Sequence, residues 1–105
     1  MNEDMMKELE SLKKIIRLAI EGNSIDQVME YLHEILNCDF IFYNYVQNNR
    51  IVMGTEENLT DSDCFEYEIG LSNELLGKIL VNISKENITD FQKKVLGYVA
   101  DVFTL

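Results

Sequence analysis

The first repeating pattern of apolar positions lies in residues 3–21, and its spacing is that of a helix. Apolar residues separated alternately by four and three positions form a heptad seam, whose members are Met5, Leu9, Leu12, Ile16 and Ala19. Ile15, Leu18 and Ile20 add apolar surface outside that seam. Acidic residues come first and basic residues later, which is the order that the helix dipole favours. Two hypotheses follow: two apolar faces with separate contacts, or one broad face buried in the core.

Two further helices are predicted from apolar stripes that follow capping sequences. Gly22 and Asn23 are expected to end the first helix, and Ser24 with Gln27 forms a capping box for the second. The second stripe comprises Ile25, Val28, Met29, Leu32, Ile35 and Leu36. A second capping box, Thr89 with Gln92, precedes a stripe that comprises Phe91, Val95, Leu96, Val99, Val102 and Phe103.

Between these helices the pattern changes to that of strands. Residues 40–46 (FIFYNYV) carry aromatic side chains on both faces, which predicts a central strand covered on both sides. Asparagines at 48–49 predict a tight turn into a partner strand at 50–54. Residues 64–69 alternate between apolar and acidic, as in a half-exposed strand. Residues 75–83 (LLGKILVNI) predict a second buried strand. The order is α-α-β-β-β-β-α, an α/β (α+β) fold with an antiparallel sheet of about four strands.

Length and charge narrow the class of protein. The 105 residues predict one domain over 1–105, and the apolar ending VADVFTL suggests a native chain that continues into an output domain. A net charge of −10 argues against nucleic acid as a partner, because binding it requires a basic surface. The same charge disfavours anionic membranes, and no apolar run is long enough to span one. We therefore expect a cytoplasmic protein.

The sequence carries few residues for catalysis or metal binding. The acidic residues of the segment 56–68 lack the ordered ligand pattern of a calcium loop, so a solvated surface is the expectation. His33 has no second histidine beside it, and Cys38 and Cys64 form no CxxC pair. No metal and no cofactor is expected, and the cysteines are expected to be reduced thiols. A thiol-based redox sensor is kept as a further alternative.

The order and residue patterns of these segments resemble the GAF family. The segment ILNCDFIFYNYV, with IVMGT as the second strand of a hairpin, is similar to that family's passage from a helix into its first strand. FEYEIG followed by LLGKILVNI resembles its penultimate pair of strands. NITDFQKKVLGYVADVF looks like its closing helix. The resemblance covers roughly residues 5–105 and implies a domain that senses small molecules or dimerises. Only residues 55–63 stand where the family's ligand-binding members build a pocket wall, which implies a shortened form. The family's methionine sulfoxide reductases carry their cysteines in that missing segment.

The resulting hypothesis is a non-catalytic sensor or dimerisation module of a bacterial-type signalling protein or transcription regulator. A small-molecule effector would contact an aromatic group, which comprises Tyr43, Tyr45, Met53, Phe65 and Tyr67. The alternative for this group is ordinary core. A homodimer would form through the heptad seam of the first helix, with the C-terminal helices completing a four-helix bundle. The alternative function is a dimerisation or protein-docking module without a pocket.

Overall fold

The computed structural model describes residues 3–21, 25–55, 59 and 64–104. Its helices are α1 (Glu3–Ile20), α2 (Ile25–Leu36) and α3 (Asp90–Phe103). The four strands are β1 (Phe40–Asn44), β2 (Asn49–Met53), β3 (Cys64–Leu71) and β4 (Glu74–Ser84). The predicted order and the α+β class are therefore confirmed.

The capping box of α3 is formed as predicted. The Thr89 hydroxyl accepts a hydrogen bond from the Gln92 backbone N–H at 3.1 Å, and the Thr89 N–H donates to Gln92 Oε1 at 2.9 Å. Two of the four backbone donors that a helix start leaves without helical partners are satisfied in this way. The predicted stop at Gly22 and Asn23 and the box begun by Ser24 lie outside the described residues.

The strands form one antiparallel sheet in the order β2-β1-β4-β3. β1 is therefore an interior strand, as its apolar sequence predicted. It ends at Asn44, two residues earlier than expected, because the Asn44 side chain accepts hydrogen bonds from the Val46 and Gln47 N–H groups at 3.1 Å each. That local bonding turns the chain before β2, and Asn48 takes the positive φ of 56° that the turn requires.

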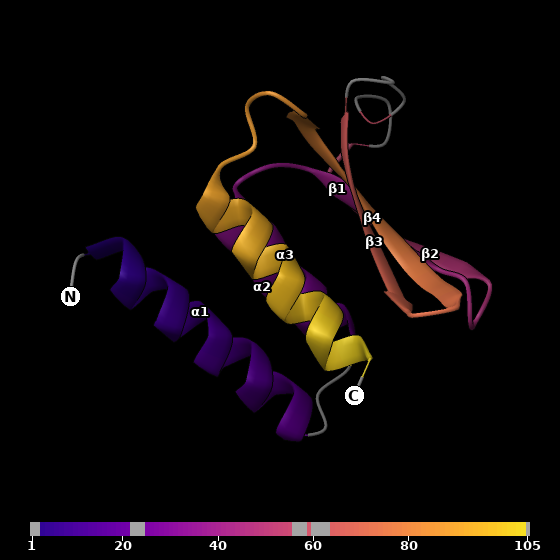
Figure 1. Ribbon diagram of the computed structural model, residues 1–105, viewed down its shortest axis with the longest axis horizontal. Coiled ribbons are helices and arrows are strands. Elements are labelled where there is room, and N and C mark those ends of the chain that lie inside the picture. Colours follow the sequence, from indigo (N-terminus) through magenta and orange to yellow (C-terminus); the bar gives the residue numbers. More distant parts are fainter. Residues whose placement is uncertain (1–2, 22–24, 56–58, 60–63, 105) are drawn as a thin grey trace.

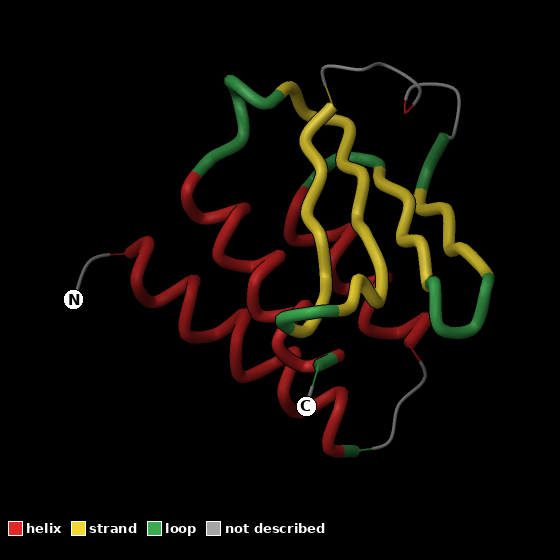
Figure 2. The backbone as a smooth tube through the Cα atoms, turned by 45° about the vertical axis from the view of Figure 1, so that its right-hand side comes forward, coloured by secondary structure: helices red, strands yellow, loops and turns green. Residues whose placement is uncertain are grey.

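The helices lie on one side of the sheet in two layers (Figure 1). α2 and α3 lie against the sheet, and α1 lies beyond them, on the side away from the sheet. Figure 2 shows the same arrangement from a second direction, with α1 along the outer margin of the molecule. β1 was expected to be covered on both sides, but the three described helices all lie on one face of the sheet, so no described helix covers its other face.

The main core lies between the sheet and the pair α2–α3. Phe40 and Phe42 of β1 pack there with Ile79 and Val81 of β4. The helices contribute Val28, Met29, Leu32, Leu36, Val95, Leu96, Val99 and Ala100. On the opposite face Ile41, which is paired with Val52 and Leu80, is also buried. The interior position of β1 thus buries consecutive side chains on both faces, whichever face the helices cover.

Candidate interaction surface on helix α1

The inner face of α1 is fixed to the domain by buried side chains. Ile15 is fully buried and extends the core to the side of α2 and α3 that faces away from the sheet, Ser11 is buried beside it, and the partly buried Leu18 packs against the same core. Full burial of an isoleucine side chain contributes about 2 kcal/mol. These residues contact the layer of α2 and α3, since α1 lies on that layer and not on the sheet (Figure 1).

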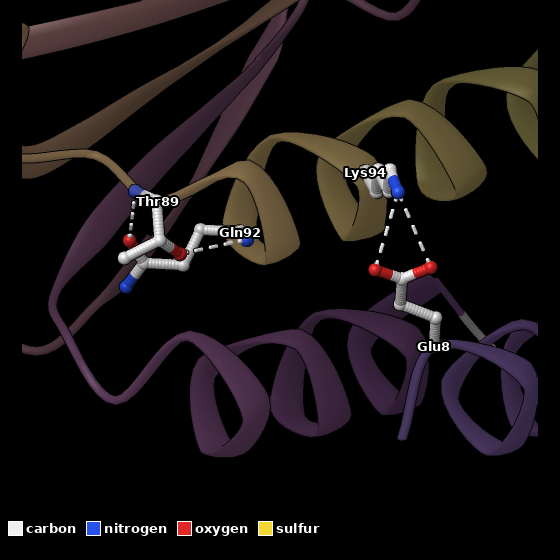
Figure 3. Close-up of polar contacts among 4 residues, drawn as sticks. All are labelled: Glu8, Thr89, Gln92 and Lys94. Carbon is white, nitrogen blue, oxygen red and sulfur yellow. Dashed lines mark hydrogen bonds and ion pairs between the residues drawn. The ribbon is translucent and has the colours of Figure 1, made fainter. Parts of the chain in front are cut away.

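Polar contacts add to the attachment of α1. Lys94 of α3 donates to both carboxylate oxygens of Glu8, at 3.3 and 3.4 Å (Figure 3). Lys14 lies 5.8 Å from the centre of the Tyr31 ring on α2. A partly exposed ion pair such as that between Lys94 and Glu8 contributes roughly 0.2–1 kcal/mol to the free energy of unfolding. Burial of Ile15 therefore contributes more to the attachment of α1 than these polar contacts do. The polar contacts favour one rotation of α1 about its own axis.

The outer face of α1 exposes a row of large apolar side chains. We call this row the α1 stripe; its members are Met5, Met6, Leu9, Ile16 and Ile20. Their exposed fractions run from 39% for Ile16 to 78% for Ile20. In a helix of 3.6 residues per turn, the centre of this stripe lies roughly 150° around the axis from the buried side. The hypothesis of one broad core face is wrong, because the helix has two apolar faces and only one is buried.

The stripe overlaps the predicted heptad seam without coinciding with it. Met5, Leu9 and Ile16 belong to both, and Ala19 is exposed beside them. Leu12 is half-buried, at the border of the inner face. Met6 and Ile20 extend the exposed surface beyond the seam, and strict heptad spacing missed both. A shallow hollow of about 360 Å³ lies at the C-terminal end, lined by Lys13, Ile16, Arg17, Ile20 and Glu21.

The aromatic group predicted to line a ligand cavity is divided by the sheet. Met53, Phe65 and Tyr67 lie on the helix-covered face and pack against the main core. Tyr43 lies on the opposite face, where it stacks with Tyr45 at a centroid distance of 6.5 Å. The five residues therefore do not line one cavity. For three of them the alternative, ordinary core packing, is the observed role.

The exposed sheet face carries charged side chains around Tyr43. Lys78 Nζ lies 5.2 Å from the centre of the Tyr43 ring and 3.7 Å from Glu66 Oε1. An open hollow of about 330 Å³ lies next to this tyrosine, at the hairpin of β1 and β2. Its lining is Tyr43, Asn44, Tyr45, Asn48, Asn49 and Arg50. Such a surface cradle leaves most of a bound small molecule in water, unlike the enclosed pockets that small ligands usually occupy.

The thiols are poorly placed for chemistry. Burial, and then the nearby Asp39 carboxylate, raise the pKa of Cys38 to about 11. A thiol with a raised pKa holds very little thiolate at neutral pH, and thiolate is the reactive form. Cys64 is a buried thiol on β3. The redox alternative therefore gains no support from the environment of either residue.

His33 contacts Asp39 in a small network at one corner of the sheet. His33 Nε2 lies 3.2 Å from Asp39 Oδ1, and Asp39 Oδ2 accepts a hydrogen bond from the Thr55 N–H at 3.2 Å. The bond from Thr55, and then the bond from His33, lower the pKa of Asp39. The network joins the end of α2 to β1 and to the segment after β2. These contacts give His33 a structural role, which is to hold the three segments together.

Neither metal sites nor membrane spans are found in the part of the chain that the structure describes. Within it, no three residues among His, Cys, Asp and Glu lie close enough together to hold a metal ion. Within the same ranges, no helix combines the length and the apolar character needed to cross a membrane. Most of the acidic segment after Thr55 lies outside them.

Comparison with known proteins adds no family to this description. The sequence matches no protein-family model, and neither a curated protein nor a solved structure is found to be similar to it. The class that the fold defines is therefore a small α+β domain with one helix-covered sheet face and an exposed apolar stripe on its outer helix.

Proposed function

We propose that this chain is a non-catalytic, GAF-like regulatory module that forms a homodimer through the outer face of α1. The exposed α1 stripe carries the proposal. Single exposed apolar residues are common on monomers, but a contiguous row of large ones marks an interaction surface. The helix cannot rotate this row inward, because Ile15 and Ser11 already occupy the inner side.

The position of α1 suggests how such a module transmits a signal. α1 rests on α2 and α3, which in turn pack on the sheet. A change at the sheet that shifts α2 or α3 therefore moves the dimer surface with it. Small helix shifts at subunit interfaces are an established way to pass a change to a second subunit or an output domain. This route supports a role in signal transduction or transcription regulation.

The first test measures the oligomeric state of a variant with two charges on the stripe. Leu9→Glu together with Ile16→Glu places four carboxylates in a symmetric interface. Sedimentation velocity should show a wild-type dimer at tens of micromolar protein. A dissociation constant in that range corresponds to a free energy of association of roughly −6 to −7 kcal/mol. The double variant should be a folded monomer, with an unchanged far-UV circular dichroism spectrum.

Val46→Glu provides the matched control. Val46 is 70% exposed in the turn between β1 and β2, away from α1. The substitution is of the same kind, an exposed aliphatic residue to glutamate, and should leave the dimer intact. A wild-type protein that stays monomeric at tens of micromolar would contradict the proposed homodimer.

A small-molecule effector is the second candidate function, and a hollow between the helices favours it. This hollow of about 350 Å³ is lined by Lys7, Glu10, Ser11, Tyr31, Glu34, Ile35 and Phe91. It combines half-buried aromatic rings with charged groups and involves all three helices. A ligand there would contact α1 directly and alter its position. Native mass spectrometry of the purified protein tests this candidate: a retained small molecule should be lost in a Tyr31→Ala, Phe91→Ala variant.

A further inference from the structure

The α1 stripe is symmetric about its own middle. Met5 and Ile20 lie equally far from the midpoint between residues 12 and 13, and so do Leu9 and Ile16. A two-fold axis perpendicular to the helix at that midpoint places Leu9 opposite Ile16 of the partner subunit. The interface of a two-fold dimer uses the same patch on both copies, so the patch must be self-complementary. This stripe meets that requirement for helices that run in opposite directions.

The charges of α1 are separated along its length. Residues 3–10 carry four acidic residues and one lysine, whereas residues 11–20 carry three basic residues and no acidic one. Antiparallel packing places each acidic half beside the basic half of the partner. Glu10 then falls opposite the segment between Lys13 and Arg17 of the partner subunit, and all three are exposed in the monomer. Parallel packing would place like halves side by side, and the helix dipoles would also repel.

Parallel packing has one favourable charge pairing, between Glu8 and Lys13 of the partner subunit, as in a coiled coil. Glu8 is not available for it, because its carboxylate is held by Lys94 of the same chain and its side chain is only 19% exposed. The antiparallel arrangement would also fill the hollow beside Ile16 and Ile20. The N-terminal part of the partner's stripe, around Leu9, would lie against it.

We therefore propose that the partner on the α1 stripe is a second copy of this chain, docked antiparallel about an axis between residues 12 and 13. This inference rests on the proposed function and adds the orientation. It places the two sheets on opposite sides of a central α1 pair. It also fixes which residues meet, so that disulfide crosslinking can read the arrangement.

The test uses the single variants Leu9→Cys and Ile16→Cys, oxidised separately and as an equimolar mixture. Residues 9 and 16 are about 10 Å apart along the helix, beyond the Cα separation of about 7 Å that a disulfide allows. The main disulfide-linked dimer in the mixture should therefore join position 9 of one chain to position 16 of the other. Each variant oxidised alone should form little disulfide-linked dimer. Peptide mass spectrometry distinguishes this product from disulfides of Cys38 and Cys64.

Self-crosslinking of each variant alone, with no mixed product, would overturn the antiparallel orientation and leave the dimer proposal standing. A dimer in sedimentation that gives neither crosslink would overturn the placement on the stripe. A monomer in sedimentation would end the proposed function itself. The three failures are therefore distinguishable.

A charge reversal gives an independent reading of orientation. Arg17→Glu places a carboxylate near the acidic half of an antiparallel partner, which should raise the dimer dissociation constant roughly five-fold, the effect typical of exposed charge contacts. In a parallel dimer the same change would relieve repulsion between basic halves and lower the constant. Lys14→Glu is the matched control, because Lys14 lies over Tyr31 on the side away from the stripe. A dissociation constant that falls in Arg17→Glu relative to Lys14→Glu would contradict the inference.

Discussion

Asp39 connects three parts of the fold through one carboxylate. Its side chain contacts His33 and the Thr55 N–H, and its backbone carbonyl accepts a hydrogen bond from the Asn82 N–H at 2.8 Å. The two side-chain contacts favour the ionised form and lower the pKa of Asp39 below its ordinary value of 3.8. A group whose pKa is lower in the folded state stabilises the protein when it is ionised.

This linkage predicts how stability changes with pH. The contribution of Asp39 is complete above pH 3.8 and is lost as the pH falls through the lower pKa of the folded state. Asp39→Asn should therefore unfold at a lower urea concentration than the wild type at pH 7. The difference between the two proteins should shrink steadily below pH 3.8. Urea titrations at a series of pH values measure it, and a difference that stays constant down to about pH 3 would contradict the assignment.

Gly54 packs against the same carboxylate and has a positive φ of 97°. A Cβ at this position would overlap the Asp39 side chain, in addition to the backbone cost of the left-handed conformation. Gly54→Ala should lower the free energy of unfolding by about 2 kcal/mol. Gly97→Ala is the control, since Gly97 lies in α3, where alanine favours the helix by about 1 kcal/mol. Its added Cβ meets only Tyr67 Oη, at 3.2 Å. Equal melting temperatures for wild type and Gly54→Ala would contradict this.

Individual residues were the hardest features to place from the sequence. Alternation along a strand divides its residues between two faces, but the register between strands decides which faces coincide. Tyr43 pairs with Lys78, whereas Tyr67 pairs with the core residue Ile79. The two tyrosines therefore lie on opposite faces, which no pattern within either strand reveals. The bond from Lys94 to Glu8 joins residues 86 positions apart and leaves no local signal.

Elements were predicted well where strong local signals marked them. The capping box of α3 is such a signal, and Gln92 also has a long-range role: its Nε2 donates to the Leu36 carbonyl at the end of α2, at 3.2 Å. The two strand ends next to the β1–β2 turn were misplaced by one or two residues, because the Asn44 side chain competes with the sheet for backbone N–H groups. The same local bonding that makes asparagine frequent in turns sets this boundary.

The double role of Gln92 predicts an order of stabilities. Thr89→Ala removes one cap and should cost about 1 kcal/mol, the usual value for such a residue. Gln92→Ala removes its bond to Thr89 and also leaves the part-buried Leu36 carbonyl without this donor, so it should cost roughly 2 kcal/mol. Thr89→Ser keeps the hydroxyl and should stay close to the wild type. Urea unfolding of the three variants checks the order, and a Thr89→Ala variant less stable than Gln92→Ala would contradict it.

The outer helix shows how far amphipathic pattern alone can be taken. Its two apolar faces could be read from the sequence, because the seam and Ile15 with Leu18 occupy different sides of the helix. The face that the domain buries could not be read, since both are apolar. The structure assigns burial to the side of Ile15 and leaves Leu9 and Ile16 exposed. Burial in the monomer thus separates the two faces, and the exposed face is the one available to a partner.

The charge of the whole molecule opposes the dimer that its outer helix favours. Each chain carries a formal charge of −10, and its shortest dimension is 27 Å. Two such charges at that separation in water repel by about 15 kcal/mol without screening. The local pairs around α1 contribute only about 1 kcal/mol each. Salt weakens both the repulsion between whole chains and the attraction of the local pairs, and the repulsion is the stronger of the two.

Added salt should consequently strengthen the dimer. The Debye length falls from about 30 Å at 0.01 M to about 10 Å at 0.1 M, which removes most of the long-range repulsion and leaves the apolar contact intact. The dissociation constant measured by sedimentation should fall roughly ten-fold or more over that range. The melting temperature of the wild type should then rise with protein concentration at about 0.1 M salt, because association stabilises the folded state. The Leu9→Glu, Ile16→Glu variant should show no such concentration dependence. A dissociation constant that rises with salt would mean that charge pairs, and not the apolar stripe, hold the two chains together.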